Sequence, residues 1–182
     1  LKLRGTDFLR PIFYFEKKGS AQVKSSIMLA SLNTPGTTII KCLPSRDHTE
    51  KMFKNCIKIP ISIKKENKYE IIKIQGLKNY NGFNYNVPGD ISSASFFIVL
   101  TLLLDKSKLT LKNINVNNSR TGIITILRKM HAKIKIKNKK NYNGEPIADI
   151  YVESTNHLKS IICPRNLNTK SIDEFLIIFL LC

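Results

Sequence analysis

Apolar residues follow two different periods along the chain, and these periods predict its helices and strands. Two stretches, Ser20 to Leu29 and Asp90 to Val99, begin with small polar residues and continue with apolar residues on nearly all sides of a helix. This pattern is typical of a buried helix. The most apolar stretches, Ala94 to Leu104 and Phe175 to Leu181, are too short to span a bilayer and also predict buried helices.

The same order of elements occurs twice. After each buried helix the sequence predicts a strand, and a Ser-Arg pair then opens an amphipathic helix. Alternation with period two predicts two further strands that close each copy. The first copy comprises a strand at 36–40, a helix at 46–56 and strands at 57–63 and 69–74. The second comprises a strand at 108–112, a helix at 120–131 and strands at 133–137 and 147–152, the last two joined by a loop at 138–145. A third copy starts at Ile172.

The predicted fold class is α+β (α/β), in repeated units whose buried helix and surface helix pack on a mixed sheet. Residues 80–89 contain the Gly and Pro that interrupt both periods, so they are the predicted linker. A cleft between two lobes built from such repeats is a natural place for a ligand.

The net charge and the cysteines limit which partners, cellular compartment and kinds of site suit this chain. The formal net charge of +17 would suit a nucleic acid or an anionic membrane as partner. The lysines, however, are scattered among Asn and Ile, so we interpret most of this charge as solvated surface. The four cysteines, Cys42, Cys56, Cys163 and Cys182, lack paired spacing, which indicates reduced thiols in the cytosol and argues against a metal site.

Two short segments indicate a small anionic substrate. Ser20-Ala-Gln-Val-Lys-Ser25 opens a helix with residues that leave backbone N–H groups available to an anion. Ser45-Arg-Asp-His-Thr-Glu50 places an arginine, two acids and a histidine just after a predicted strand.

Six motifs resemble the enolpyruvyl transferases and, among them, the EPSP synthase family. They are Leu9-Arg-Pro-Ile12, Gly19-Ser-Ala-Gln-Val-Lys-Ser25, Ser45-Arg-Asp-His-Thr-Glu50, Val87-Pro-Gly-Asp-Ile-Ser-Ser-Ala94, Asn118-Ser-Arg-Thr-Gly122 and Ile172-Asp-Glu174, in the order and spacing of that family. The resemblance implies two lobes of βαβαββ units. It places residues 1–86 in the first lobe, as about one and a half units, and residues 87–182 in the second, as one unit and the start of the next. We therefore expect an internal segment of a longer protein.

The resemblance also implies a reaction of the shikimate pathway, in which the enolpyruvyl group of phosphoenolpyruvate moves to the 5-hydroxyl of shikimate 3-phosphate. It implies no metal or organic cofactor, no nucleic-acid or membrane partner, a cytoplasmic location and a monomer when full length. Residues that complete the family's site lie outside this stretch, so the isolated chain is expected to lack turnover.

Site residues follow by matching position. Ser20, Ala21, Gln22 and Arg46 are expected to bind shikimate 3-phosphate, and Gln22 to reach phosphoenolpyruvate as well. Asp173 is expected to bind the 5-hydroxyl and accept its proton.

Other interpretations of the same residues stay open. Ser20 and Asp173 could be ordinary helix caps, as we favour for Asp90, and Arg46 could form a surface ion pair with Asp47. Arg120 is interpreted as structural. Among functions, the alternatives are a UDP-N-acetylglucosamine enolpyruvyl transferase, a basic nucleic-acid-binding module and a non-catalytic remnant.

Overall fold

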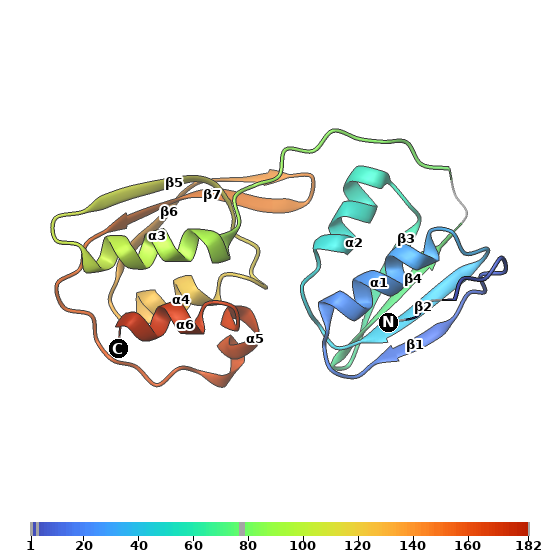
Figure 1. Ribbon diagram of the computed structural model, residues 1–182, viewed down its shortest axis with the longest axis horizontal. Coiled ribbons are helices and arrows are strands. Elements are labelled where there is room, and N and C mark those ends of the chain that lie inside the picture. Colours follow the sequence, from blue (N-terminus) through green and yellow to red (C-terminus); the bar gives the residue numbers. More distant parts are fainter. Residues whose placement is uncertain (1, 3, 77–78, 182) are drawn as a thin grey trace. The chain divides into compact units, whose positions relative to one another are not determined.

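The computed structural model describes residues 2, 4–76 and 79–181. The chain forms two compact units, Leu1–Asn84 and Tyr85–Cys182, called unit 1 and unit 2 below (Figure 1). The boundary predicted from the sequence lies two residues later, after residue 86. Each unit is described by itself.

Unit 1 is a four-stranded sheet with two helical segments. Its strand order is β1-β2-β4-β3, in which β1 and β2 are parallel and the other pairs are antiparallel. The elements are β1 (Phe13–Glu16), α1 (Ala21–Ser31), β2 (Thr37–Cys42), α2 (His48–Met52), the π-helical turn Phe53–Ile57, β3 (Ile61–Glu66) and β4 (Tyr69–Gln75).

The parallel pair fixes where the chain leaves the sheet. The last residues of the two strands, Glu16 and Cys42, lie opposite each other in the register. Because parallel strands need a crossover, α1 returns the chain to the start of β2, and both strands end at the same edge. The segments that follow β1 and β2 therefore begin side by side.

A small apolar core holds α1 and the π-helical turn on this sheet. It contains Met28 from α1 and Phe53 from the turn, packed with Ile40, Ile72 and Ile74 from the strands. Cys42 belongs to the same core, and burial raises the pKa of its thiol to about 11.

Unit 2 repeats this plan. Its sheet order is β5-β7-β6, and Gly89 forms a parallel bridge to Ile114 of β5, at the position that β1 has beside β2. The elements are α3 (Ile91–Leu103), β5 (Lys108–Asn115), α4 (Gly122–Lys129), β6 (Lys133–Tyr142), β7 (Glu145–Glu153), the 3-10 turn Arg165–Leu167, α5 (Asn168–Ser171), α6 (Phe175–Ile178) and the 3-10 turn Phe179–Leu181. The repeated order of helix, strand, helix and two strands predicted from the sequence is confirmed, and unit 1 contains the complete βαβαββ unit that the resemblance implies.

Asp90 caps the start of α3 and also binds Arg120. The carboxylate accepts hydrogen bonds from the Ser93 backbone N–H at 2.9 Å and from Arg120 Nη2 at 2.9 Å. Partial burial alone would raise the pKa of the Asp90 carboxyl, but the hydrogen bonds from Ser93 and the charge of Arg120 outweigh it. The pKa therefore lies below its ordinary value of 3.8. The capping role favoured for Asp90 and the structural role expected of Arg120 are both confirmed.

The structure corrects two predicted boundaries. The loop predicted at 138–145 is wrong, because β6 and β7 continue to a tight turn at Asn143-Gly144, where both residues have positive φ. A β-bulge at Asn138, which also has a positive φ, lets β6 continue past the residues that interrupt the alternation of apolar and polar positions. In unit 1 the strand predicted from residue 57 begins only at Ile61, because Lys58 is left-handed and ends the helical turn.

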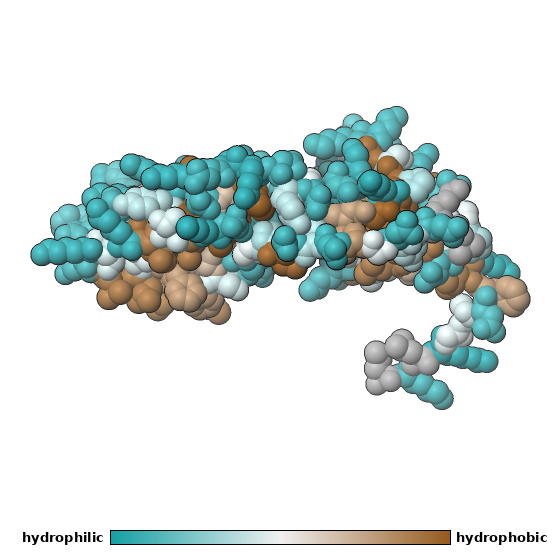
Figure 2. All heavy atoms as spheres, turned by 90° about the horizontal axis from the view of Figure 1, so that it is seen from above, coloured by the Kyte–Doolittle hydropathy of each residue, from teal (hydrophilic) through white to brown (hydrophobic). Residues whose placement is uncertain are grey.

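The prediction that the most apolar helices are buried is also wrong in part. One face of α3 packs on the sheet, but Phe96, Phe97 and Leu100 are more than half exposed. In α6 Ile178 is buried, whereas Leu176 is 82% exposed. Apolar side chains accordingly gather on one face of unit 2, seen in brown in Figure 2. A helix this apolar is buried only where something covers each of its faces.

Two further expectations concern cysteines and membranes. Cys42, Cys56 and Cys163 are free thiols, and Cys182 lies outside the described residues. Among the residues that the structure describes, no helix has both the length and the apolar character needed to cross a bilayer.

We predict that Gly76→Ala destabilises unit 1. A Cβ atom at Gly76 would overlap the backbone oxygens of Ser31, the last residue of α1, and of Thr34, three residues further on, so this segment must shift. The expected loss is about 1–3 kcal/mol of unfolding free energy, measured by urea unfolding with far-UV circular dichroism. Gly82→Ala is the matched control, because a Cβ there meets nothing within 4 Å. Equal stability of the two variants would contradict the packing described.

We also predict a pH-dependent effect of Asp90→Asn. A lowered pKa means that ionised Asp90 stabilises the fold above its ordinary pKa, and this contribution is lost as the pH falls through the folded-state pKa. Asn can still cap α3, so the loss at neutral pH is at most about 1 kcal/mol. Urea unfolding between neutral pH and about pH 2.5 should show the difference from the wild type shrinking below about pH 4. A difference that is independent of pH would refute the charge pairing.

Candidate functional site

The loop between β1 and α1 is organised by one buried carboxylate. Glu16, the last residue of β1, accepts hydrogen bonds from the backbone N–H groups of Lys18, Gly19 and Ser20 at 2.8, 2.5 and 3.0 Å. Its side chain is buried, and Gly19 has a φ of +72°, which favours glycine. The loop therefore delivers Ser20 to the start of α1 in a fixed position.

Ser20 caps α1, as one interpretation of the sequence proposed. Its hydroxyl accepts a hydrogen bond from the Val23 N–H at 3.3 Å. The first N–H groups of a helix have no partner within the helix, so those of Ala21 and Gln22 point outward from its start. Ser20 and Ala21 are partly exposed and Gln22 is exposed, so an anion could reach this end of the helix.

Arg46 lies in the segment that follows β2, and this segment is tied to α1. Lys24 Nζ, in the first turns of α1, donates to the Arg46 carbonyl at 2.9 Å and pairs with Glu50 of α2 at 2.5 Å. Ser25 and Thr49 share a hydrogen bond of 2.7 Å beside it. The structure thus brings Arg46 into the same part of unit 1 as Ser20 and Gln22.

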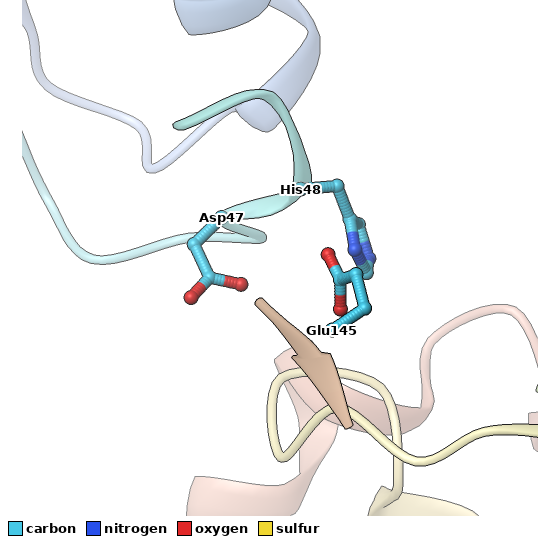
Figure 3. A group of neighbouring side chains, drawn as sticks. All are labelled: Asp47, His48 and Glu145. Carbon is cyan, nitrogen blue, oxygen red and sulfur yellow. The ribbon is translucent and has the colours of Figure 1, made fainter. Parts of the chain in front are cut away.

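The start of α2 contains the other charged residues of the second motif. Asp47 precedes the helix and pairs with Lys51 at 3.1 Å, one turn later. His48 is the first residue of α2 (Figure 3) and is partly exposed.

Asp173 belongs to unit 2, where it is exposed and precedes α6. The N-cap position of α6 is Glu174, which is buried and accepts a short hydrogen bond from Ser92 of α3. Ser92 also accepts from Arg120 Nη2 at 2.7 Å. These contacts attach the segment that contains Asp173 to the start of α3. That Asp173 shares a site with Ser20 and Arg46 stays a prediction.

A second buried acid organises the start of β7. Glu145, its first residue (Figure 3), accepts hydrogen bonds from the side-chain amides of Asn115 at 3.1 Å and Asn117 at 3.3 Å. Within either unit taken alone, no three His, Cys, Asp or Glu side chains of the described residues lie close enough to hold a metal ion.

Unit 2 also has an open groove of about 630 Å³ at the C-terminal ends of α3 and α4. Lys106, His131, Lys133 and His157 are among its lining residues. None of the site residues predicted from the sequence lines it.

Sequence reasoning missed three residues that shape the site: Glu16, Lys24 and Glu50. No role is predicted for Lys24 from the sequence, yet its side chain is 0% exposed. One signal was present, because Lys24 lies one turn before Met28 on the face of α1 that packs on the sheet.

Comparison with known proteins gives one consistent answer. The family model of EPSP synthase (3-phosphoshikimate 1-carboxyvinyltransferase) matches residues 1–182. The 3-phosphoshikimate 1-carboxyvinyltransferase of Petrotoga mobilis is 42% identical over 176 residues, which cover 96% of this chain and 39% of the relative. That of a Thermoanaerobacter species is 44% identical over 172 residues, covering 93% and 39%.

A solved structure agrees with these sequence matches. EPSP synthase from Acinetobacter baumannii superposes with a TM-score of 0.81 at 37% identity, covering 95% of this chain and 38% of that one. The chain spans about two-fifths of the length of the curated relatives it matches. The relatives are named for the shikimate substrate, which favours this branch over the UDP-N-acetylglucosamine enzymes and over a nucleic-acid-binding module. The chain therefore belongs to the EPSP synthase (3-phosphoshikimate 1-carboxyvinyltransferase) family.

Proposed function

We propose that the protein containing this chain transfers the enolpyruvyl group of phosphoenolpyruvate to the 5-hydroxyl of shikimate 3-phosphate. The observation that supports this most strongly is the family match along all 182 residues, with the six motifs in register. In the reaction the 5-hydroxyl oxygen adds to the enol carbon while the methylene carbon gains a proton. Loss of inorganic phosphate and of one proton from the resulting methyl group then restores the double bond in the product.

The geometry of unit 1 suits the phosphorylated substrate. The start of α1 presents backbone N–H donors and the positive end of the helix dipole, both of which favour a phosphate group. Arg46 follows the neighbouring strand and is attached to the same helix through Lys24. A guanidinium group has several fixed donors that suit oxyanions. We therefore assign shikimate 3-phosphate to Ser20, Ala21, Gln22 and Arg46.

Two further roles complete the proposal. Gln22, exposed one residue inside α1, reaches phosphoenolpyruvate as well as the shikimate substrate. Asp173 binds the 5-hydroxyl and accepts its proton when the oxygen attacks, since a carboxylate within hydrogen-bond reach can act as a general base. The reaction uses no metal or organic cofactor.

The proposal also covers the cellular location, the oligomeric state and the partners of the protein. We place it in the cytoplasm as a monomer when complete, with small-molecule substrates and no nucleic-acid partner. The scattered lysines support solvated charge rather than a binding face for a polyanion.

A chimeric protein provides the test. In it the chain replaces the matching stretch of the Petrotoga mobilis relative, which supplies the flanking segments. Phosphate release from phosphoenolpyruvate and shikimate 3-phosphate measures turnover, and circular dichroism verifies folding. Turnover by the folded chimera is expected, whereas the 182-residue chain alone is expected to give none. A folded chimera without turnover would contradict the proposed function.

Gln22→Ala is expected to weaken binding of both substrates to the chimera. Losing one hydrogen bond to a charged group costs about 1.5–3 kcal/mol, so the dissociation constant of shikimate 3-phosphate should rise about tenfold or more. Isothermal titration calorimetry measures it. Gln75→Ala is the matched control, because Gln75 is an exposed glutamine at the far end of β4. Equal affinities of the two variants would remove Gln22 from the site.

Asp173→Asn is expected to lower kcat of the chimera by about 10²- to 10⁴-fold, because asparagine cannot accept the proton of the 5-hydroxyl. The variant should still fold, since Asp173 is exposed. Asp105→Asn, an exposed aspartate beyond α3, serves as the control and should keep wild-type turnover. Unchanged kcat in Asp173→Asn would refute the assignment of the base.

A further inference from the structure

Lys24 is a fully buried lysine in a chain whose other charges are largely on the surface. Its side chain is 0% exposed, and it occupies the core-facing side of α1 together with Met28. Lysine is almost never fully buried unless it is paired, because removing an ammonium group from water is costly. Its presence here requires an explanation in terms of its partners.

Those partners all belong to the segment that follows β2. Lys24 Nζ lies 2.5 Å from Glu50 Oε1 and 2.9 Å from the carbonyl oxygen of Arg46. Ser25, the residue after Lys24, shares a hydrogen bond with Thr49, the residue before Glu50, and so joins α1 to the same segment. Together these contacts attach residues 46–50 to the first turns of α1 at three points.

The pair is poorly suited to stabilising the fold. Glu50 is 3% exposed, and burial raises the pKa of its carboxyl despite the opposing effect of Lys24. Among the described residues its second oxygen, Oε2, is buried and has no hydrogen-bond partner. A buried ion pair with unsatisfied atoms is often no more stable than an apolar pair of similar volume. Stability alone therefore does not account for these two charges.

We propose that Lys24 and Glu50 are positioning residues that hold Arg46 beside the start of α1. The ammonium group bridges Glu50 to the Arg46 carbonyl, which fixes the backbone from which the arginine side chain extends. Arg46 and the N–H groups of Ala21 and Gln22 can then act on one anion. This inference rests on the proposed function for the identity of that anion, shikimate 3-phosphate, but not for the backbone geometry.

The decisive variant replaces both charges with apolar residues, Lys24→Met with Glu50→Leu. It leaves no unpaired buried charge, so it is expected to fold at least as stably as the wild type. Lys41→Met is the matched control, because Lys41 forms a partly exposed pair with Glu66 at 3.5 Å on the same unit.

Hydrogen exchange of the 182-residue chain tests the positioning without any substrate. In the apolar double variant the amides of residues 46–50 should exchange at least tenfold faster, although the unfolding free energy is unchanged or higher. Lys41→Met should leave those amides unchanged. Wild-type exchange rates at residues 46–50 in the double variant would overturn the inference.

Binding to the chimera tests the consequence for the site. The double variant should raise the dissociation constant of shikimate 3-phosphate about tenfold, and on an Arg46→Gln background it should add less than twofold, because it acts through Arg46. Full additivity of the two effects would show that the pair does not act through Arg46. If the wild-type chimera itself fails to bind shikimate 3-phosphate, the proposed function fails, and hydrogen exchange still decides the positioning.

Discussion

The parallel pairing of β1 with β2 is the constraint on which the rest of unit 1 depends. Glu16 and Cys42 end the two strands opposite each other, so the chain leaves the sheet twice at the same edge. Ser20 and Arg46 each follow four residues after those ends. The topology therefore places Ser20 and Arg46 in the same part of unit 1. The buried carboxylate of Glu16 and the Lys24–Glu50 ion pair then fix the segments that contain them.

In unit 2 the corresponding edge of the sheet has a charged helix cap instead of a neutral one. There the helix start is capped by Asp90, whose carboxylate binds Arg120, whereas the corresponding start in unit 1 is capped by the neutral Ser20. An acid at the cap satisfies the helix dipole from within the chain and repels a second anion. One plan of strands and helices thus gives an edge suited to an external anion in unit 1 and an edge occupied by an internal one in unit 2.

The sequence predicted the features that depend on local pattern. The repeated order of elements and the caps at Ser20 and Asp90 follow from periodicity and small polar residues, and both are present. Features that depend on tertiary partners were missed. Lys24 is buried only because Glu50 comes from another helix, and the bulge at Asn138 continues a strand through residues that favour turns. Whether the segments of the two units form one site depends on their relative placement, which no local pattern encodes.

Cys42 gives this edge of the sheet a chemical property of its own. Its thiol lies in the core at the end of β2 with a pKa of about 11, so almost none of it is ionised in a neutral solution. Peroxides and alkylating reagents attack the thiolate form. The strand end that leads to Arg46 should therefore resist oxidative damage even though a cysteine stands there.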